Sequence, residues 1–173
     1  NITAFDEPID KIVAVMQADE FRATWVANKA VYRTRMAIAD GGELVVIAPG
    51  VERFGEQPEV DDLIRKYGYL SQAEVLELYQ TEADMQDIPH GTAHLVHGSS
   101  EGRFTITYAP GGLTKEEIES VGYQYLALDE ALERYNPDVM KDGWNDMPDG
   151  ERVFYISTPS AGLWATKEKL GDR

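Results

Sequence analysis

The chain has 173 residues, the size of one domain, with 31 acidic against 16 basic residues and a formal net charge of −15. This charge disfavours binding to nucleic-acid backbones and to anionic membranes, and no apolar run approaches the roughly 20 residues of a membrane helix. The absence of cysteine from the sequence excludes disulfides, cysteine nucleophiles and thiolate metal sites.

The first third of the chain predicts a βαβ unit. Residues 12–16 form a short, β-branched apolar run that is typical of a buried strand. Residues 26–39 lack Gly and Pro and predict a helix, which residues 40–42 (Asp-Gly-Gly) end. A second buried strand follows at residues 44–48. Two all-apolar strands joined by a helix indicate a parallel sheet that is covered on both faces.

The rest of the chain continues this alternation. Capping-box patterns at residues 71–74 and 114–117 predict helix starts. The predicted helices cover about 60–66, 72–82, 92–97, 115–121 and 129–135, and the predicted strands 104–108, 123–126 and 153–156, with a loop at 136–150. The sequence therefore predicts a single α/β domain over residues 1–173, with a Rossmann-like, mostly parallel sheet flanked by helices.

Lys29 is the first candidate binding residue. It lies in the first turns of the predicted helix 26–39, where a cation opposes the helix dipole at a cost of about 0.3–1 kcal/mol. An anionic group docked there would offset this cost, so the position is compatible with an anion site. The alternative is a solvated lysine. Trp25, one turn earlier, is more typical of the core or its rim than of a binding surface.

The three histidines, His90, His94 and His97, lie within eight residues of one another. On one helix they would form a stripe with a geometry that suits a metal. We favour the alternative, in which His90 lies in a loop beside Gly91 while His94 and His97 are helical, one packed and the other near the helix end at Gly98. His90 is then the histidine best placed to touch a ligand, and we expect no metal held by this chain.

Residues 24–46 resemble the C-terminal domain of the nickel-pincer lactate racemase family. The resemblance rests on Trp25, on Lys29 four positions later, on the Gly-Gly turn at residues 41–42, and on the buried strand that follows at the same distance. The later pattern of a weak strand followed by residues 128–133 also fits. The resemblance covers most of the chain, with residues 24–46 as its specific part.

This resemblance implies a 2-hydroxyacid racemase or epimerase that uses a nickel-pincer nucleotide. In such enzymes the cofactor takes a hydride from the substrate Cα and returns it to either face of the keto acid, and histidines serve as acid and base for the hydroxyl proton. Lys29 aligns with the family lysine that meets the substrate carboxylate, which implies a catalytic and substrate-binding role. Trp25 aligns with an aromatic residue that walls the substrate site, and His90 falls near an aromatic residue over the cofactor.

Two departures from the family pattern predict a different substrate. Val26 stands where lactate racemases carry a substrate-binding glutamine, and Trp25 replaces their tyrosine. The loss of a donor and the gain of apolar bulk favour a 2-hydroxyacid that is larger or more apolar than lactate.

The family's cofactor-bearing lysine, nickel-ligating histidine and acid/base histidines belong to an N-terminal domain that is absent from this sequence. We therefore expect the C-terminal half of a larger two-domain protein, inactive alone, whose site closes against its own N-terminal domain. The start at Asn1 in place of Met favours the same expectation. A cytoplasmic location is expected, because the sequence starts with nothing like a signal peptide.

Another class of function fits the same residues. A self-standing α/β module could bind a small anion at Lys29 without catalysis. A purely structural or oligomerising domain is the third possibility. The spacing from Trp25 to Lys29 favours the racemase family over the binding module, and the acidic composition offers no obvious apolar patch for an oligomerising domain.

Overall fold

The computed structural model describes residues 1–171, and its centre is a six-stranded sheet. The strands are β2 (Ile9–Val15), β3 (Ile38–Ala48), β4 (Thr105–Pro110), β5 (Gln124–Tyr125), β6 (Gly143–Asp146) and β7 (Arg152–Ile156). They lie in the order β5-β4-β3-β2-β7-β6, and every neighbouring pair is parallel except β6 and β7. The predicted α/β class with a mostly parallel sheet is confirmed, whereas β6 lies in a segment predicted to be loop.

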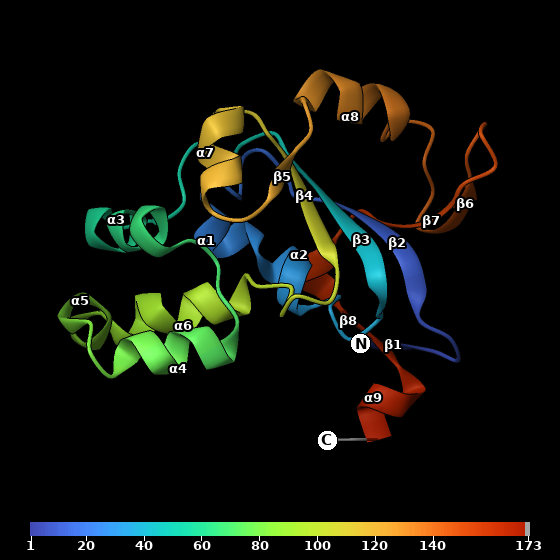
Figure 1. Ribbon diagram of the computed structural model, residues 1–173. Helices are drawn as coiled ribbons and strands as arrows, with labels where there is room; N and C mark the ends of the chain where they lie inside the picture. The colour runs from blue at the N-terminus through green and yellow to red at the C-terminus, as the bar shows by residue number, and fades with distance from the viewer. Residues whose placement is uncertain (172–173) are drawn as a thin grey trace.

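Helices connect the parallel strands. They are α1 (Thr24–Ala27), α2 (Lys29–Tyr32), α3 (Pro58–Tyr67), α4 (Gln72–Tyr79), α5 (Ala83–Asp87), α6 (Pro89–His97), α7 (Lys115–Ser120) and α8 (Leu128–Arg134). In Figure 1, α1 and α2 lie between the sheet and the group of helices α3 to α6. No helix within residues 1–171 has both the length and the apolar character needed to span a bilayer.

Each face of the sheet has its own core, because successive residues of a strand point to opposite faces. Ile12 and Ala14 of β2 belong to the larger core, which α1, α2, α3, α6 and α7 cover. Val13 of the same strand belongs to a smaller core, together with Ala131 of α8 and Tyr135. The continuous apolar runs in β2 and β3 therefore follow from burial on both faces.

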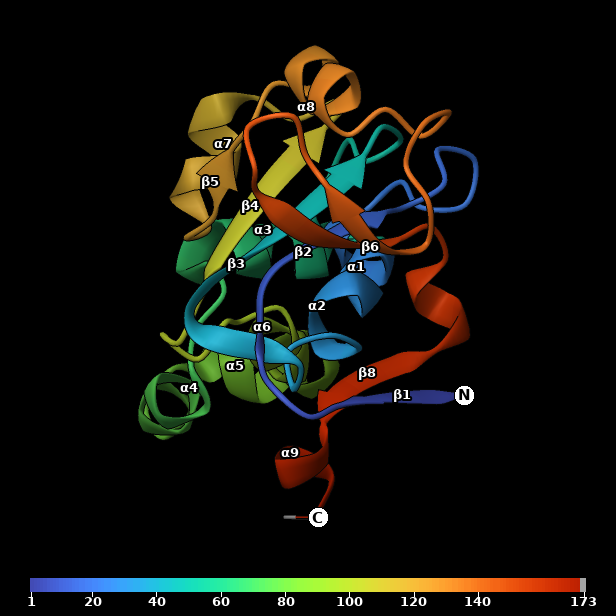
Figure 2. The same ribbon diagram turned by 90° about the vertical axis from the view of Figure 1, so that its right-hand side faces the viewer.

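A second, two-stranded sheet pairs segments from opposite ends of the described chain. β1 (Ile2–Phe5) runs parallel to β8 (Leu163–Thr166), and Figure 2 shows this pair below the six-stranded sheet. A short 3-10 helix, η1 (Pro159–Ala161), precedes β8, and α9 (Lys167–Gly171) follows it. Backbone hydrogen bonds from Trp164 to Arg33 (2.9 Å) and from Thr166 to Met36 (3.0 Å) hold β8 against the segment that follows α2.

The predicted continuous helix at residues 26–39 is wrong. The chain forms two four-residue helices, α1 and α2, separated by Asn28, whose side chain is fully buried. Residues 33–37 are turns, and residue 38 already belongs to β3. The βαβ connection itself is confirmed, since β2 and β3 are parallel neighbours.

The Gly-Gly turn does not end a helix. Residues 40–42 lie inside β3, where the register shifts: between two paired positions β2 advances by two residues and β3 by five. Gly41 has a φ of 78°, in the left-handed region that favours glycine. The glycines therefore serve an irregularity in the pairing of β2 with β3, which is an interior strand of the sheet.

Both predicted capping boxes are confirmed. Ser71 and Glu74 exchange side chain–backbone hydrogen bonds at the start of α4, and Thr114 and Glu117 do the same at the start of α7. These short-range patterns were predictable because all partners lie within four residues of one another.

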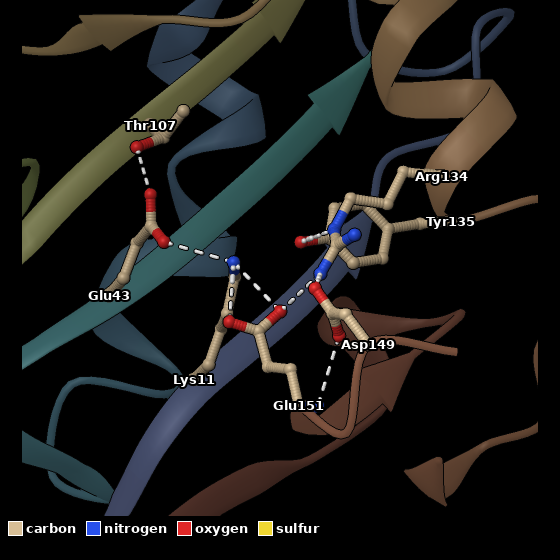
Figure 3. Close-up of polar contacts among 7 residues, drawn as sticks. All are labelled: Lys11, Glu43, Thr107, Arg134, Tyr135, Asp149 and Glu151. Atoms are coloured by element: carbon tan, nitrogen blue, oxygen red, sulfur yellow. Dashed lines mark hydrogen bonds and ion pairs between the residues drawn. The ribbon is translucent and has the colours of Figure 1, made fainter. Parts of the chain in front are cut away.

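A polar network crosses the sheet on the side of α8 (Figure 3). Lys11 of β2 forms ion pairs of 3.2 Å with Glu43 of β3 and with Glu151, just before β7. Arg134 of α8 contacts Glu151 at 2.8 Å and Asp149 at 3.0 Å. Burial alone would lower the pKa of Lys11, but its contacts with Tyr135, Glu43 and Glu151 outweigh this effect and raise it. The network ties the β6–β7 hairpin to the parallel strands.

We expect Glu151→Gln to destabilise the protein by about 1 kcal/mol at neutral pH, a value discounted for partial solvent exposure. Burial would raise the pKa of Glu151, but hydrogen bonds from Arg134 and Lys11 lower it overall from its usual 4.5. A lowered carboxyl pKa stabilises the folded state above the unfolded pKa, and this stabilisation is lost as the pH falls below about 4.5. Urea unfolding at pH 7 and at pH 3.5 measures the difference between wild type and variant.

Glu133→Gln is the matched control, because Glu133 is an exposed glutamate on α8 outside the network. It should leave the unfolding free energy nearly unchanged at both pH values. An equal loss in Glu133→Gln, or a Glu151→Gln loss that grows as the pH falls, would contradict the assigned role of the network.

Candidate functional site

A cavity of about 930 Å³ lies between α1, α2 and α6 and is closed at one side by β8. The residues that line it are Trp25, Val26, Lys29, Tyr32, Arg33, Arg35, Met36, His90, Ala93, His94, His97 and Leu163. The cavity thus brings together Trp25, Lys29 and His90, the three residues that the sequence singles out. The three residues therefore share one site.

The charged groups that line the cavity are cations. Lys29, Arg33 and Arg35 are among the lining residues, and no aspartate or glutamate is. Among residues 1–171, no carboxylate forms an ion pair with any of these three side chains. In a chain with a net charge of −15, a cavity lined in this way attracts anions.

The two arginines are held by backbone carbonyls. Nη1 of Arg33 donates to the carbonyl of Gly162 at 3.0 Å, and Nη1 of Arg35 donates to the carbonyl of Val96 at 3.3 Å. Burial lowers the pKa of Arg35, while the nearby charges of Glu101 and Arg103 act on it in opposite directions. A partly buried guanidinium with only carbonyl partners retains free donors for a ligand.

Lys29 is the first residue of α2 and is half-buried. Its Nζ lies 6.0 Å from the centroid of the Phe21 ring, at the outer limit of a cation–π contact. Because α2 is a single turn, the helix-dipole argument for Lys29 no longer applies. Its lack of a carboxylate partner among the described residues supports an anion site instead.

Buried polar residues fix the positions of Trp25 and Lys29. Thr24 directly precedes Trp25, and its Oγ1 donates to the carbonyl of Phe54 at 3.0 Å. Asn28 directly precedes Lys29 and bonds to two tyrosine hydroxyls: Tyr108 donates to its Oδ1 at 2.9 Å, and its Nδ2 donates to Tyr123 at 3.0 Å. The helix break at Asn28 is therefore anchored by residues 80 and 95 positions away.

Three stacked tyrosines form the floor behind Asn28. The ring centroids of Tyr69 and Tyr123 are 4.8 Å apart, those of Tyr123 and Tyr108 are 5.3 Å apart, and the rings of each pair are nearly parallel. Burial raises the pKa of all three hydroxyls, which keeps them neutral donors at physiological pH. Gly98 packs against this floor, because a Cβ there would lie 2.4 Å from the Tyr69 ring and 2.5 Å from Asn28 Nδ2.

The placement of His90 in a loop is wrong. Pro89 is the first residue of α6, so His90, His94 and His97 all lie on this helix. His90 is exposed, and its ring meets Trp25 edge to face with centroids 6.1 Å apart. Trp25 and His90 also line a smaller neighbouring cavity of about 190 Å³ with Glu56, Gln57 and Val60.

His94 is the packed histidine of the three, as one of the helical pair was predicted to be. It is 5% exposed and lies between Trp25, at 4.7 Å between ring centroids, and Tyr69, at 5.3 Å. Burial, with a smaller contribution from His97, lowers the pKa of His94 to about 3. Within residues 1–171, no group of three or more His, Asp or Glu side chains is close enough together to hold a metal ion.

Sequence reasoning did not propose Arg33, Arg35 or His94 as ligand-facing residues, although all three line the cavity. On a continuous helix over residues 26–39, both arginines would lie away from the apolar face, whereas the turns at residues 33–37 place them in the lining of the cavity. A clustering of cations in residues 29–35 of an acidic chain was the available signal.

Residues 98–102 have the sequence Gly-Ser-Ser-Glu-Gly, which matches the Gly-x-Ser-x-Gly pattern of hydrolase nucleophiles. In those enzymes the serine lies on a turn from a strand to a helix. Here the segment follows α6 and leads into β4, and no hydrogen bond among the described residues joins Ser100 to a histidine. The pattern therefore does not indicate a catalytic serine.

Comparison with solved structures identifies similar folds. The chain aligns with a protein from Thermotoga maritima with a TM-score of 0.71 and 22% identity, over 96% of this chain and 39% of that one. It also aligns with the lactate racemase apoprotein from Thermoanaerobacterium thermosaccharolyticum, with a TM-score of 0.60 and 12% identity, over 91% of this chain and 36% of that one. The chain thus spans well under half the length of these two proteins. No protein family and no curated protein sequence matches it.

Proposed function

We propose that this chain is the C-terminal, substrate-binding half of a 2-hydroxyacid racemase or epimerase, and that Lys29 binds the carboxylate of the substrate. The observation that carries this proposal is the cavity that Lys29, Arg33 and Arg35 line, with no carboxylate in its lining. Similarity of the fold to part of a lactate racemase supports the choice of reaction class. The residues specific to this family, Trp25 and Lys29, both face the cavity.

The apolar part of the cavity suits the side chain of a hydroxyacid. Val26, Met36, Ala93 and Leu163 line it together with the indole of Trp25. A hydrophobic wall of this size favours a substituent larger than the methyl group of lactate, since each buried methylene contributes about 0.8 kcal/mol. The cations would then bind the carboxylate end, and the apolar wall the other end of the same molecule.

The nickel-pincer nucleotide implied by the resemblance does not fit a site within this chain. The described residues offer no metal-ligand cluster, and Nε2 of His94 is already hydrogen-bonded to Tyr69. We propose that the cofactor is held outside this chain, by an N-terminal domain, and that His90 and Trp25 touch its edge from this side of the cleft. When bound there, the group would supply hydride transfer at the substrate Cα; this chain would bind and orient the substrate.

The direct test is a titration of the 173-residue chain with 2-hydroxyisocaproate, followed by NMR. We expect shifts of the Trp25 indole and of the Lys29 and Ala93 resonances, with Trp144 as an internal control, because it lies on β6 away from the cavity. Binding should weaken with salt, since the attraction is between a carboxylate and fixed cations. Shifts spread over residues outside the cavity, or no saturable shift at all, would reject the site.

A small-anion binding module without catalysis is the second candidate, and the same cations favour it. Nickel-dependent racemisation by the native polypeptide that carries this sequence distinguishes the two. Racemisation supports the first proposal. Binding by a native product of about 19.3 kDa without racemisation supports the module.

A further inference from the structure

A chain of hydrogen bonds runs from the cavity into the core, and His94 forms its cavity end. Its Nε2 lies 2.9 Å from Oη of Tyr69, which lies 2.6 Å from Oγ1 of Thr24. Oγ1 of Thr24 lies 3.0 Å from the carbonyl oxygen of Phe54. The last group is a carbonyl and can only accept.

Because the carbonyl of Phe54 can only accept, it determines the donor and the acceptor of every hydrogen bond in the chain. Thr24 has a single hydroxyl proton and uses it to donate to Phe54. Tyr69 must then donate to Thr24, so that Nε2 of His94 carries a hydrogen and donates to Tyr69. In the opposite direction, lone pairs of Thr24 and Phe54 would face each other across 3.0 Å with no hydrogen between them. The chain therefore selects the Nε2–H form of the neutral imidazole.

Nδ1 of His94 is left with a free lone pair. It has no hydrogen-bond partner among the described residues. Every fully buried side-chain nitrogen and oxygen of those residues does have a partner, so Nδ1 is not fully buried. Nδ1 is therefore accessible, and the space that His94 lines is the cavity. Burial lowers the pKa of the ring to about 3, so this nitrogen stays an acceptor and does not take up a proton near neutral pH.

We propose that Nδ1 of His94 accepts a hydrogen bond from the 2-hydroxyl of the bound acid and thereby makes the cavity select 2-hydroxyacids over the corresponding 2-keto acids. This inference rests on the proposed function, which supplies a carboxylate bound at Lys29. A keto oxygen offers no hydrogen and would set its lone pairs against that of Nδ1. His94 is then a specificity-determining residue, and Tyr69 and Thr24 are positioning residues that act through it.

The tautomer is measured first, on the ligand-free 173-residue chain, by ¹⁵N–¹H correlation of the histidine rings. We expect His94 with a protonated Nε2 and an unprotonated Nδ1. Thr24→Val removes the acceptor for the Tyr69 hydroxyl at nearly constant volume, so that Tyr69 donates to Nε2 and the tautomer reverses. A His94 with hydrogen on Nδ1 in the wild-type chain would overturn the inference without any ligand.

Binding is measured next with three matched acids: 2-hydroxyisocaproate, 2-oxoisocaproate and isocaproate. The hydroxyacid should bind about tenfold more tightly than the other two, which corresponds to one net hydrogen bond. Thr24→Val should abolish the preference for the hydroxyacid, because a hydroxyl oxygen and a keto oxygen can both accept a hydrogen bond from a protonated Nδ1. Tyr69→Phe, which leaves both tautomers of His94 accessible, should reduce this preference. Circular dichroism of both variants checks that they remain folded.

The outcomes separate this inference from the proposed function. Equal affinity of the wild-type chain for the hydroxyacid and the keto acid would refute selection by His94 and leave the carboxylate site at Lys29 in place. Failure of all three acids to bind would refute the proposed function, and with it the selection, even where the tautomer is as expected.

Discussion

Replacing Lys29 with methionine should weaken the binding of 2-hydroxyisocaproate by about 100-fold, since a charge-assisted hydrogen bond in a partly buried site contributes about 1.5–3 kcal/mol. Lys29 is half-buried, has no carboxylate partner among the described residues, and lies in the same cavity as Arg33 and Arg35. Methionine keeps the apolar stem of the side chain and removes its charge. Calorimetric titration of the 173-residue chain measures the loss.

Lys115→Met is the control for this substitution, because Lys115 is an exposed lysine at the start of α7 and its loss changes the net charge equally. It should leave the affinity within about twofold of wild type, as expected for a screened surface charge. Both variants should unfold at the wild-type temperature. A similar loss in both would show that net charge, and not the position of Lys29, governs binding.

Substitution of Lys29 should also affect catalysis in a polypeptide that carries the proposed cofactor-bearing half. Lys29→Ala should there abolish racemisation while leaving the fold intact, since the substrate would no longer be oriented by its carboxylate. A Lys29→Ala enzyme that turned over its hydroxyacid at the normal rate would contradict the role assigned to this lysine.

Asn28→Ala should be the most destabilising of the substitutions considered for the site, by about 3–4 kcal/mol. The substitution leaves a small void and removes the acceptor for the buried hydroxyl of Tyr108, whose hydrogen bond to Asn28 is 2.9 Å long. Tyr123 keeps the carbonyl of Gly98 as an acceptor at 2.6 Å and is less affected. The melting temperature should fall by roughly 10 °C, given 2–4 °C per kcal/mol for a domain of this size.

A double-mutant cycle isolates the unsatisfied hydroxyl. Tyr108→Phe removes the group that Asn28→Ala strands, so the double variant should be less destabilised than the sum of the two single variants by about 1–2 kcal/mol. Asn136→Ala, an exposed asparagine after α8, is the control and should cost no more than about 1 kcal/mol. Additive single effects would show that Asn28 and Tyr108 act independently.

The parts of the fold that were predictable from sequence depend on neighbours within a few residues. Apolar runs located the central strands, and the capping boxes at Ser71 and Thr114 located two helix starts. The prediction of one helix over residues 26–39 was wrong because Asn28 forms its hydrogen bonds with Tyr108 and Tyr123, which lie far along the chain. β1 and β8 were missed for the same reason, since each is defined by the other.

In the candidate site too, residues marked by local sequence patterns were predictable, and a residue whose role depends on distant partners was not. Trp25 and Lys29 were found by their spacing in a family-like stretch, and His90 by its neighbours, and all three line one cavity. His94 was missed as a ligand-facing group because its significance depends on Tyr69 and Thr24, which fix the hydrogen on its ring. No local pattern in the sequence contains that information.

In α1, α2 and the residue between them, the buried residues position the backbone, and the residues next to them line the cavity. Thr24 and Asn28 hold the backbone through hydrogen bonds in the core, while Trp25, Val26 and Lys29 line the cavity, and Trp25 and Val26 also pack against the edge of the core. Under the proposed function, an exchange of Val26 or Trp25 for a side chain of similar volume would change the accepted acid, while Thr24 and Asn28 continue to hold the backbone.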